Sequence, residues 1–305
     1  MSALDDMFTS IQNIVVEDSH IIGMESDGSS DNYWIILNNT RYLMKDCSYN
    51  KRRKQDSYAP YCEYIASHFI EGFGLDVHET QLATWNNKVV VLCKDLFQGV
   101  TFKTFSNVSE SSAGTEVESK EYTYNDVCYI LNKLNPSMLN NFWDMFLMDA
   151  IIANRDRHGG NWGYIRKDNM INFSPLYDQG HSLLPDVNLD DWADEEFIRK
   201  RVYEIPGSQF KMWKEGINDR PMRTNFYEVI NQSMSDPLFI DRLNKLRNKE
   251  HLLKNVLFSI DNKLIPKRFL IFSRIILYCR FQCLIMFRDF DEVVKEAYNL
   301  FMEKS

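Results

Sequence analysis

The stretch "NRDRHGGNWG", residues 154–163, carries an unusual density of chemically active side chains for its length. It holds two Arg, two Asn, one Asp, one His and three Gly, directly after the strongly apolar run "FWDMFLMDAIIA" (142–153). A surface turn needs Gly and Asn, but it needs neither a carboxylate nor an imidazole. The stretch is therefore either a polar turn or an active-site loop, and the rest of the chain has to distinguish the two.

The spacing of Asp156 and Asn161 favours the second interpretation. Four residues separate them, as in the D-x-x-x-x-N catalytic loop of kinase-type phosphotransferases. There the Asp accepts the proton of the attacking hydroxyl and the Asn side-chain oxygen binds a metal. The alternative is a polar turn in which Asn161 caps local backbone. His158 is a further catalytic candidate, although we favour a role in ordering the loop through hydrogen bonds.

A second carboxylate follows 17 residues after Asn161. In "SPLYDQGHS" (174–182), Asp178 comes after an apolar triplet and before Gly180, which gives a D-x-G pattern. In kinases such an Asp holds Mg²⁺ against the phosphates of ATP. Mg²⁺ prefers hard oxygen ligands, so Asn161 and Asp178 together form a candidate metal site. An ordinary Asp-x-Gly turn is the alternative.

The N-terminal part offers a matching cation. "TRYLMK" (40–45) ends a strand-like run at Lys45, and "YCEYIASHF" (61–69) places Glu63 in an otherwise mostly apolar helix pattern. A buried Glu needs a partner, and in kinases a strand Lys pairs with a Glu on the following helix to hold the α- and β-phosphates. Lys45 and Glu63 are the candidate pair. A surface Lys and a solvent-facing Glu are the alternative.

Two further segments complete the candidate nucleotide site. The loop "GMESDGSSDNYW" (23–34), with Gly28 and Ser29 at its centre, precedes the Lys45 strand and offers backbone N–H groups to phosphates. It lacks a G-x-G-x-x-G pattern and carries acidic residues, which makes it the weakest element. The segment "VVVLCKDLF" (89–97) is expected to connect two lobes, with the backbone of three residues facing the adenine ring: Cys93, Lys94 and Asp95.

The pattern along the chain predicts an α+β fold with two lobes. Short β-like runs dominate residues 12–45, with hairpin turns expected at the Asn pairs 38–39 and 86–87. We expect a β-rich N-terminal lobe over 1–97 and a mostly helical lobe over 98–305, with the Ser/Thr/Glu-rich segment 101–121 as a flexible connector. A cleft between two lobes would suit a ligand.

The composition excludes several classes of protein. The 305 residues are 44% hydrophobic and 26% charged, with a net charge of −8, which argues against a general nucleic-acid binder. None of the six Cys forms a CxxC pair, and Cys279 and Cys283 are expected to be buried helix residues. No signal peptide is visible, and Arg residues interrupt the most apolar stretch, 269–287. A cytoplasmic protein with no membrane partner is expected, and secretion without a signal peptide is the alternative.

The order of these segments resembles the HipA-like serine/threonine kinases, most closely their small cell-translocating kinase A type. Their fold is distantly similar to that of phosphoinositide kinases. The resemblance covers most of residues 15–210 and is most specific over 142–180, where the N-x-D-x-H-x-x-N loop is matched by four residues: Asn154, Asp156, His158 and Asn161. It implies that Asp156 is the base, that Asn161 and Asp178 bind the metal, and that Lys45 grips ATP.

The resemblance implies an ATP- and Mg²⁺-dependent kinase of Ser or Thr hydroxyls in a protein substrate, with a toxin or effector role. Autophosphorylation is expected in the loop, at Ser26, Ser29 or Ser30. We expect this chain to lack the extra N-terminal subdomain of larger relatives, which leaves an antitoxin partner open. A kinase of small-molecule or lipid hydroxyls and a nucleotide-binding pseudokinase remain alternatives, although a pseudokinase usually lacks at least one of the residues present here.

Overall fold

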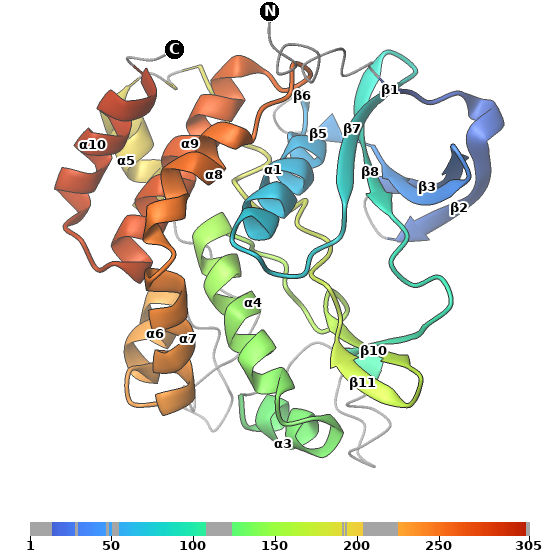
Figure 1. Cartoon of the computed structure of the whole chain (residues 1–305). Helices are drawn as coiled ribbons and strands as arrows, with labels where there is room; N and C mark the ends of the chain where they lie inside the picture. The colour runs from blue at the N-terminus through green and yellow to red at the C-terminus, as the bar shows by residue number, and fades with distance from the viewer. Residues whose placement is uncertain are drawn as a thin grey trace, which may run out of the picture.

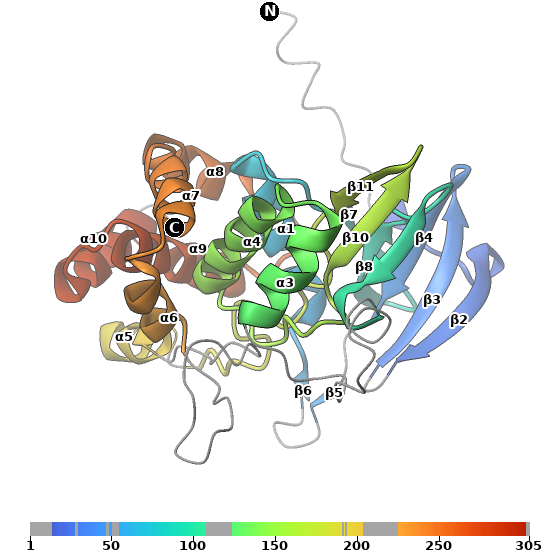
Figure 2. The ribbon, with the colours of Figure 1, turned by 90° about the horizontal axis from the view of Figure 1, so that it is seen from below.

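The computed structural model describes residues 14–27, 30–46, 49–50, 55–107, 124–190, 192, 194–203 and 225–302. In this part of the chain, strands gather at one end of the molecule and most helices at the other (Figure 1). The view from below shows the same division (Figure 2). A β-rich N-terminal part thus precedes a helical part, as the sequence predicts, while the boundary between residues 97 and 98 stays a prediction.

The main sheet contains six strands in the order β1-β7-β8-β4-β3-β2, and only the β1–β7 pair is parallel. In chain order these strands are β1 (Ile14–Val15), β2 (Ile21–Asp27), β3 (Ser30–Leu37), β4 (Thr40–Lys45), β7 (Thr80–Trp85) and β8 (Lys88–Lys94). A separate two-stranded sheet is formed by β5 (Tyr49–Asn50) and β6 (Gln55–Asp56). The central position of β4 and β8 places Lys45 and Cys93 well inside the sheet.

Paired asparagines form two of the hairpin turns. Asn38 and Asn39 join β3 to β4, and Asn86 and Asn87 join β7 to β8, with φ between 49° and 62° at all four. This left-handed conformation is strained for most residues but is tolerated by Asn, and it matches the twist of the flanking strands. Both hairpins predicted at the Asn pairs are confirmed.

The loop predicted over residues 23–34 is mostly strand. β2 pairs with β3 up to Asp27 opposite Ser30, so the backbone groups that a loop would offer to a ligand are largely used in the sheet. The prediction of a long phosphate loop is therefore wrong for the strand residues. Gly28 and Ser29 lie outside the described residues, as do the side chains of Ser26 and Ser30, so the phosphate-contact and autophosphorylation predictions made for them stay predictions.

Along the chain, the described helices come after the strands of the main sheet, apart from α1, which precedes β7. They are α1 (Ala59–Gly72), α3 (Tyr124–Leu134), α4 (Met138–Ile152), α5 (Glu195–Tyr203), α6 (Phe226–Ser233), α7 (Pro237–Arg247), α8 (Leu253–Ser259), α9 (Lys267–Arg280) and α10 (Phe290–Met302), with the shorter turns η2 (Asp18–His20), η3 (Glu250–Leu252) and η4 (Phe281–Ile285). Cys279 and Cys283 are buried in α9 and η4, as predicted. No helix in the described ranges is long and apolar enough to cross a bilayer.

Helix α1 is packed from two sides. It contacts β7 and β8 of the main sheet on one side. On the other, the ring of Tyr58 stacks on Phe269 of α9 with centroids 4.3 Å apart, and Phe73 packs on Phe281 of η4 at 5.4 Å. One apolar core therefore runs from the sheet through α1 into the helices. This packing fixes the position of Glu63, which α1 carries.

A three-stranded sheet corrects the predicted connector. β9 (Thr101–Thr104) pairs with β10 (Gly163–Lys167), which pairs with β11 (Met170–Phe173). The connector expected over 101–121 is therefore wrong for its first four residues, and residues 108–121 lie outside the described ranges. Phe102 of β9 stacks on Phe97 with centroids 3.9 Å apart, an apolar contact that the polar average composition of the segment conceals.

Gly163 lies very close to the backbone of the neighbouring strand β9. A Cβ there would lie 2.1 Å from the carbonyl oxygen of Lys103 and 2.8 Å from Cα of Thr104, both backbone atoms of β9. We expect Gly163→Ala to lower the unfolding free energy by about 1–3 kcal/mol, because the strands must separate. Urea denaturation measures this, with Gly23→Ala as control, since a Cβ there meets nothing within 4 Å. Equal unfolding free energies of the two variants would contradict the close approach.

Candidate active site

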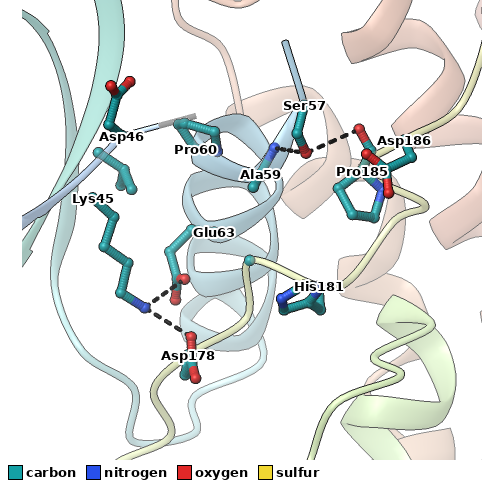
Figure 3. Close-up of a pocket in the computed structure, with 12 residues that line it drawn as sticks. Lys45, Asp46, Ser57, Ala59, Pro60, Glu63, Asp178, His181, Pro185 and Asp186 are labelled. Atoms are coloured by element: carbon teal, nitrogen blue, oxygen red, sulfur yellow. Dashed lines mark hydrogen bonds and ion pairs between the residues drawn. The ribbon is translucent and has the colours of Figure 1, made fainter. Parts of the chain in front are cut away.

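Lys45 joins the two candidate carboxylates. Its Nζ lies 3.1 Å from Oε2 of Glu63 on α1 and 2.8 Å from Oδ1 of Asp178 in the segment after β11 (Figure 3). Glu63 is fully buried, while the Lys45 side chain is 19% and the Asp178 side chain 33% exposed. Residues 133 positions apart are thus in direct contact. The structure brings together the three residues that the sequence analysis took from separate motifs.

Glu63 has two further donors on its other oxygen. Oε1 accepts the backbone N–H of Gln179 at 2.7 Å and lies 2.9 Å from Nε2 of His78. Gly180 makes the close approach possible, since a Cβ there would lie 3.2 Å from Oε2 of Glu63. His78 was not predicted from the sequence, where its only signal is a His between a predicted helix and a predicted strand.

These contacts set the charge of the site. Burial raises the pKa of Glu63, but the positive charge of Lys45 and the hydrogen bonds from His78 and Gln179 outweigh it and hold the pKa well below its usual value. Burial also raises the pKa of Asp178, but the positive charge of Lys45 lowers it by more, so the net pKa shift is downward. Burial lowers the pKa of Lys45, but Asp178 and Glu63 raise it well above normal. All three groups are therefore ionised at neutral pH.

This charge state predicts how Glu63 stabilises the fold at different pH. Because the folded-state pKa of Glu63 is depressed, its contribution is present above its unfolded-state pKa and is lost as pH falls through the folded-state value. We expect wild type to exceed Glu63→Gln by about 3 kcal/mol in unfolding free energy at pH 7. Urea denaturation should give a constant difference above about pH 5 and a smaller one below about pH 4. A difference that grows with acid would contradict the assignment.

The stretch at 154–163 is held by a buried ion pair. Arg157 contacts both carboxylate oxygens of Asp149 on α4, with Nε at 2.9 Å from Oδ2 and Nη2 at 3.0 Å from Oδ1, and both side chains are 1% exposed. Asn154 donates its side-chain N–H to Oδ1 of Asp149 at 3.0 Å. Nη1 of Arg157 then donates to the carbonyls of Asn161 and Tyr177 at 2.7 and 2.5 Å. One guanidinium therefore ties the catalytic-loop candidate to the Asp178 segment.

The remaining loop residues are ordered by local bonds. The backbone N–H of Asp156 donates to Oδ1 of Asn154, and the side-chain N–H of Asn161 donates to the carbonyl of Asp156 at 2.8 Å. Nδ1 of His158 accepts the backbone N–H of Gly160 at 3.0 Å, which is the ordering contact favoured from the sequence. The Asp156 side chain turns toward the Asp178 segment, where Nε2 of His181 lies 4.0 Å from its Oδ2.

Two cavities meet at Lys45 and Asp178. The first, shown in Figure 3, is lined by Asp46, Ser57, Ala59, Pro60, Glu63, Val91, Gly180, His181, Pro185 and Asp186 beside these two. The second is lined, beside the same two, by Trp34, Leu43, His78, Cys93, Lys94, Asp95, Leu96, Phe97 and Tyr177. One cavity therefore leads past α1 and the Asp178 segment, and the other is bounded by apolar and aromatic side chains.

The predicted adenine-facing residues line this second cavity, but their backbone donors are partly used. The N–H of Lys94 donates to the carbonyl of Glu79 at 3.0 Å, and the N–H of Asp95 donates to the carbonyl of Arg41 at 3.0 Å. Cys93 pairs within the sheet, opposite Thr80 on one side and Leu43 on the other. These residues therefore line the cavity, two of their backbone N–H groups are bonded within the protein, and their contact with an adenine ring stays a prediction.

The model of the HipA-like C-terminal domain matches residues 17–225, which is more than half of the chain and contains every site residue described above. The chain belongs to the HipA-like C-terminal domain family. The serine/threonine-protein kinase CtkA of Helicobacter pylori is 32% identical over 217 residues, which cover 65% of this chain and 63% of that protein. The match thus spans less than two thirds of the length of this relative.

Solved structures agree with the assignment to the HipA-like family. The crystal structure of the Helicobacter pylori proinflammatory kinase CtkA superposes with a TM-score of 0.74 at 25% identity, covering 96% of this chain and 100% of that chain. HipA of Shewanella oneidensis MR-1, solved with HipB and operator DNA, gives a TM-score of 0.51 at 15% identity over 95% of this chain and 69% of that chain. The second likeness concerns the fold alone. The predicted α+β, kinase-like fold is confirmed.

Proposed function

We propose that this protein is an ATP- and Mg²⁺-dependent kinase that transfers a phosphoryl group to a Ser or Thr hydroxyl of a protein. The observation that carries the proposal is the contact of Lys45 with both Glu63 and Asp178, beside a loop that holds Asp156. Kinase catalysis depends on positioning and on electrostatic stabilisation, for which a strand Lys fixed by a helix Glu is required. The name of the Helicobacter relative supports a protein hydroxyl as acceptor.

The second cavity fits a nucleotide base. Its wall combines Trp34 and Leu43 with the connector residues Leu96 and Phe97, and Lys45 stands at the end shared with the first cavity. A base between apolar walls and phosphates at Lys45 would span both cavities. In this arrangement the Lys45 ammonium binds phosphate oxygens and Glu63 keeps it oriented.

Asp178 and Asn161 carry oxygen atoms of the kind that Mg²⁺ binds. Asp178 is one third exposed at both cavities, and Lys45 contacts only its Oδ1 among the described ion pairs. The side-chain N–H of Asn161 is used by the carbonyl of Asp156, which leaves the amide oxygen as the ligand atom. A carboxylate and an amide oxygen are the hard ligands that this ion prefers. When bound, Mg²⁺ neutralises charge on the phosphates of ATP.

Asp156 would receive the proton of the attacking hydroxyl. Its backbone is fixed by Asn154 and Asn161, and Nε2 of His181 lies 4.0 Å from its carboxylate. The hydroxyl loses its proton to Asp156 as the oxygen attacks the terminal phosphorus, and the bond to the β-phosphate oxygen breaks. His158 is best assigned to loop order, because its Nδ1 is bonded to the loop backbone.

The proposal is tested by intact mass after incubation with Mg-ATP, with Asp156→Ala alongside. We expect added phosphate on wild type only, because autophosphorylation needs the base as well as the nucleotide. Peptide mapping then locates the site, with Ser26, Ser29 and Ser30 as the proposed positions. A mixture of candidate protein and small-molecule hydroxyl acceptors is assayed in parallel. Nucleotide binding without phosphoryl transfer to any acceptor would favour a pseudokinase.

The biological setting belongs to the proposal as well. We propose a cytoplasmic protein that acts without a nucleic-acid or membrane partner, and a toxin or effector role that the kinship with HipA and CtkA supports. A cognate antitoxin is testable by co-purification. The acidic net charge of −8 speaks against direct binding to DNA.

A further inference from the structure

His78 is the one His that is buried against the Lys45 pair in the part of the chain that the structure describes. It lies between α1 and β7 and is 4% exposed. Its Nε2 lies 2.9 Å from Oε1 of Glu63 and 3.1 Å from Oγ of Ser67. An ionised carboxylate only accepts hydrogen bonds, so Nε2 carries the proton and donates it to Glu63.

The backbone of His78 is bonded to the Asp178 segment. Its N–H donates to the carbonyl of Leu176 at 2.9 Å, and the N–H of Leu176 donates to the carbonyl of Asp76 at 2.8 Å. Three residues after Leu176, the N–H of Gln179 donates to the same Oε1 of Glu63 at 2.7 Å. The two donors on this oxygen thus come from two segments that are bonded to each other. Glu63 is held in a closed ring of hydrogen bonds.

The freedom that remains to Glu63 is rotation of its own side chain. Helix α1 packs on the sheet on one side. On the other side, Tyr58 and Phe73 at its two ends contact Phe269 and Phe281. These contacts oppose a movement of the whole helix that would separate Glu63 from Lys45. Rotation would move Oε2 off Lys45, and it requires Oε1 to leave both of its donors. Removing the His78 or the Gln179 donor would therefore make this rotation easier.

We propose that His78 is a positioning residue that holds Glu63 on Lys45 before any nucleotide binds. The proposal rests on the proposed kinase function, because it concerns the residue that orients the phosphate-binding Lys. It implies that the ion pair is assembled in the free protein. The ion pair would then need no movement of the Glu63 helix in order to form.

The direct test follows the reactivity of Lys45 without nucleotide. Amine acylation at fixed pH, quantified by peptide mass spectrometry, reports how readily the Lys45 amine reacts, and its contacts with Glu63 and Asp178 slow that reaction. We expect His78→Leu to label on the order of tenfold faster than wild type, because the Lys45 ammonium loses one of its two carboxylate contacts. His78→Gln, whose amide can donate to Glu63, should return the rate to within about twofold of wild type. Ser67→Ala removes the other partner of Nε2 and should label like wild type.

A kinetic cycle separates positioning from simple support of the fold. Phosphoryl transfer is compared in wild type, His78→Leu, Glu63→Gln and the double variant. If His78 acts through Glu63, adding His78→Leu to Glu63→Gln changes kcat and KM for ATP no further. Equal proportional losses in both backgrounds would overturn the proposal, as would unchanged Lys45 labelling in a folded His78→Leu protein.

Two controls cover the cases in which His78→Leu does not fold or the protein transfers no phosphoryl group. His78→Asn keeps a polar side chain too short to reach Glu63, and it replaces His78→Leu if that variant does not fold. Lys45 labelling needs no phosphoryl transfer, so it tests His78 even if the protein proves inactive towards every acceptor. In that case the proposed function fails on the mass measurement while the positioning role is judged on labelling alone.

Discussion

Asp156→Ala is expected to lower phosphoryl transfer by about 10²–10⁴-fold, the usual contribution of a general base. The backbone bonds of residue 156 to Asn154 and Asn161 do not involve the removed carboxylate, so the loop should keep its shape. Nucleotide affinity should stay within about twofold of wild type. Single-turnover kinetics measure the first quantity, and titration with Mg-ATP measures the second.

Asp178→Asn is the matched variant for this measurement. It removes a charge that contacts Lys45 at 2.8 Å and that is proposed to hold the metal. We expect Mg-ATP affinity to fall by at least about tenfold, or 1.4 kcal/mol, with a smaller effect on ATP alone. Equal effects of the two variants on Mg-ATP binding would contradict the separate roles of base and metal ligand.

Arg157→Ala is expected to cost about 3–5 kcal/mol of unfolding free energy. It leaves the buried carboxylate of Asp149 without its cation, and breaking a buried pair costs this much because the remaining charge is not solvated. It also removes the donor shared by the carbonyls of Asn161 and Tyr177. Urea denaturation monitored by Trp fluorescence gives the free energy.

Arg155→Ala is the control for this prediction. Arg155 lies two residues away in the same loop and is exposed, so its loss should change stability by no more than about 0.5 kcal/mol. The double replacement Arg157→Met with Asp149→Leu should recover part of the loss, because no buried charge remains. A similar cost for Arg155→Ala and Arg157→Ala would refute the ion pair as the main support of the loop.

The local pattern predicted most elements because each has a short-range cause. Asn pairs set the hairpins, the apolar face of residues 61–73 set α1, and the D-x-G pattern pointed to Asp178. The pairing of Lys45 with Glu63 followed from the cost of burying a lone carboxylate. Asp149 stands in the apolar run before the loop. The same cost of burying a lone carboxylate predicts a cationic partner for it as well.

What escaped prediction depends on contacts between distant segments. No local pattern assigns His78 to Glu63, because their contact arises from the bridge between Val77 and Leu176. β9 was missed because its partner β10 lies about sixty residues later, and a polar composition hides a four-residue strand. The backbone N–H groups of Lys94 and Asp95 donate to the carbonyls of Glu79, just before β7, and of Arg41 in β4, which only the folded structure reveals.

The packing of α1 on the C-terminal helices also sets an order of assembly during synthesis. Tyr58 and Phe73 find their partners at Phe269 and Phe281, some two hundred residues later in the chain. A nascent chain that ends before these residues exposes part of the apolar surface around α1, and such surface is prone to aggregation. The helix that carries Glu63 reaches its final environment only when α9 and η4 have left the ribosome. The side of the Lys45–Glu63 pair that α1 carries is therefore expected to gain its final packing only after Phe281 has been synthesised.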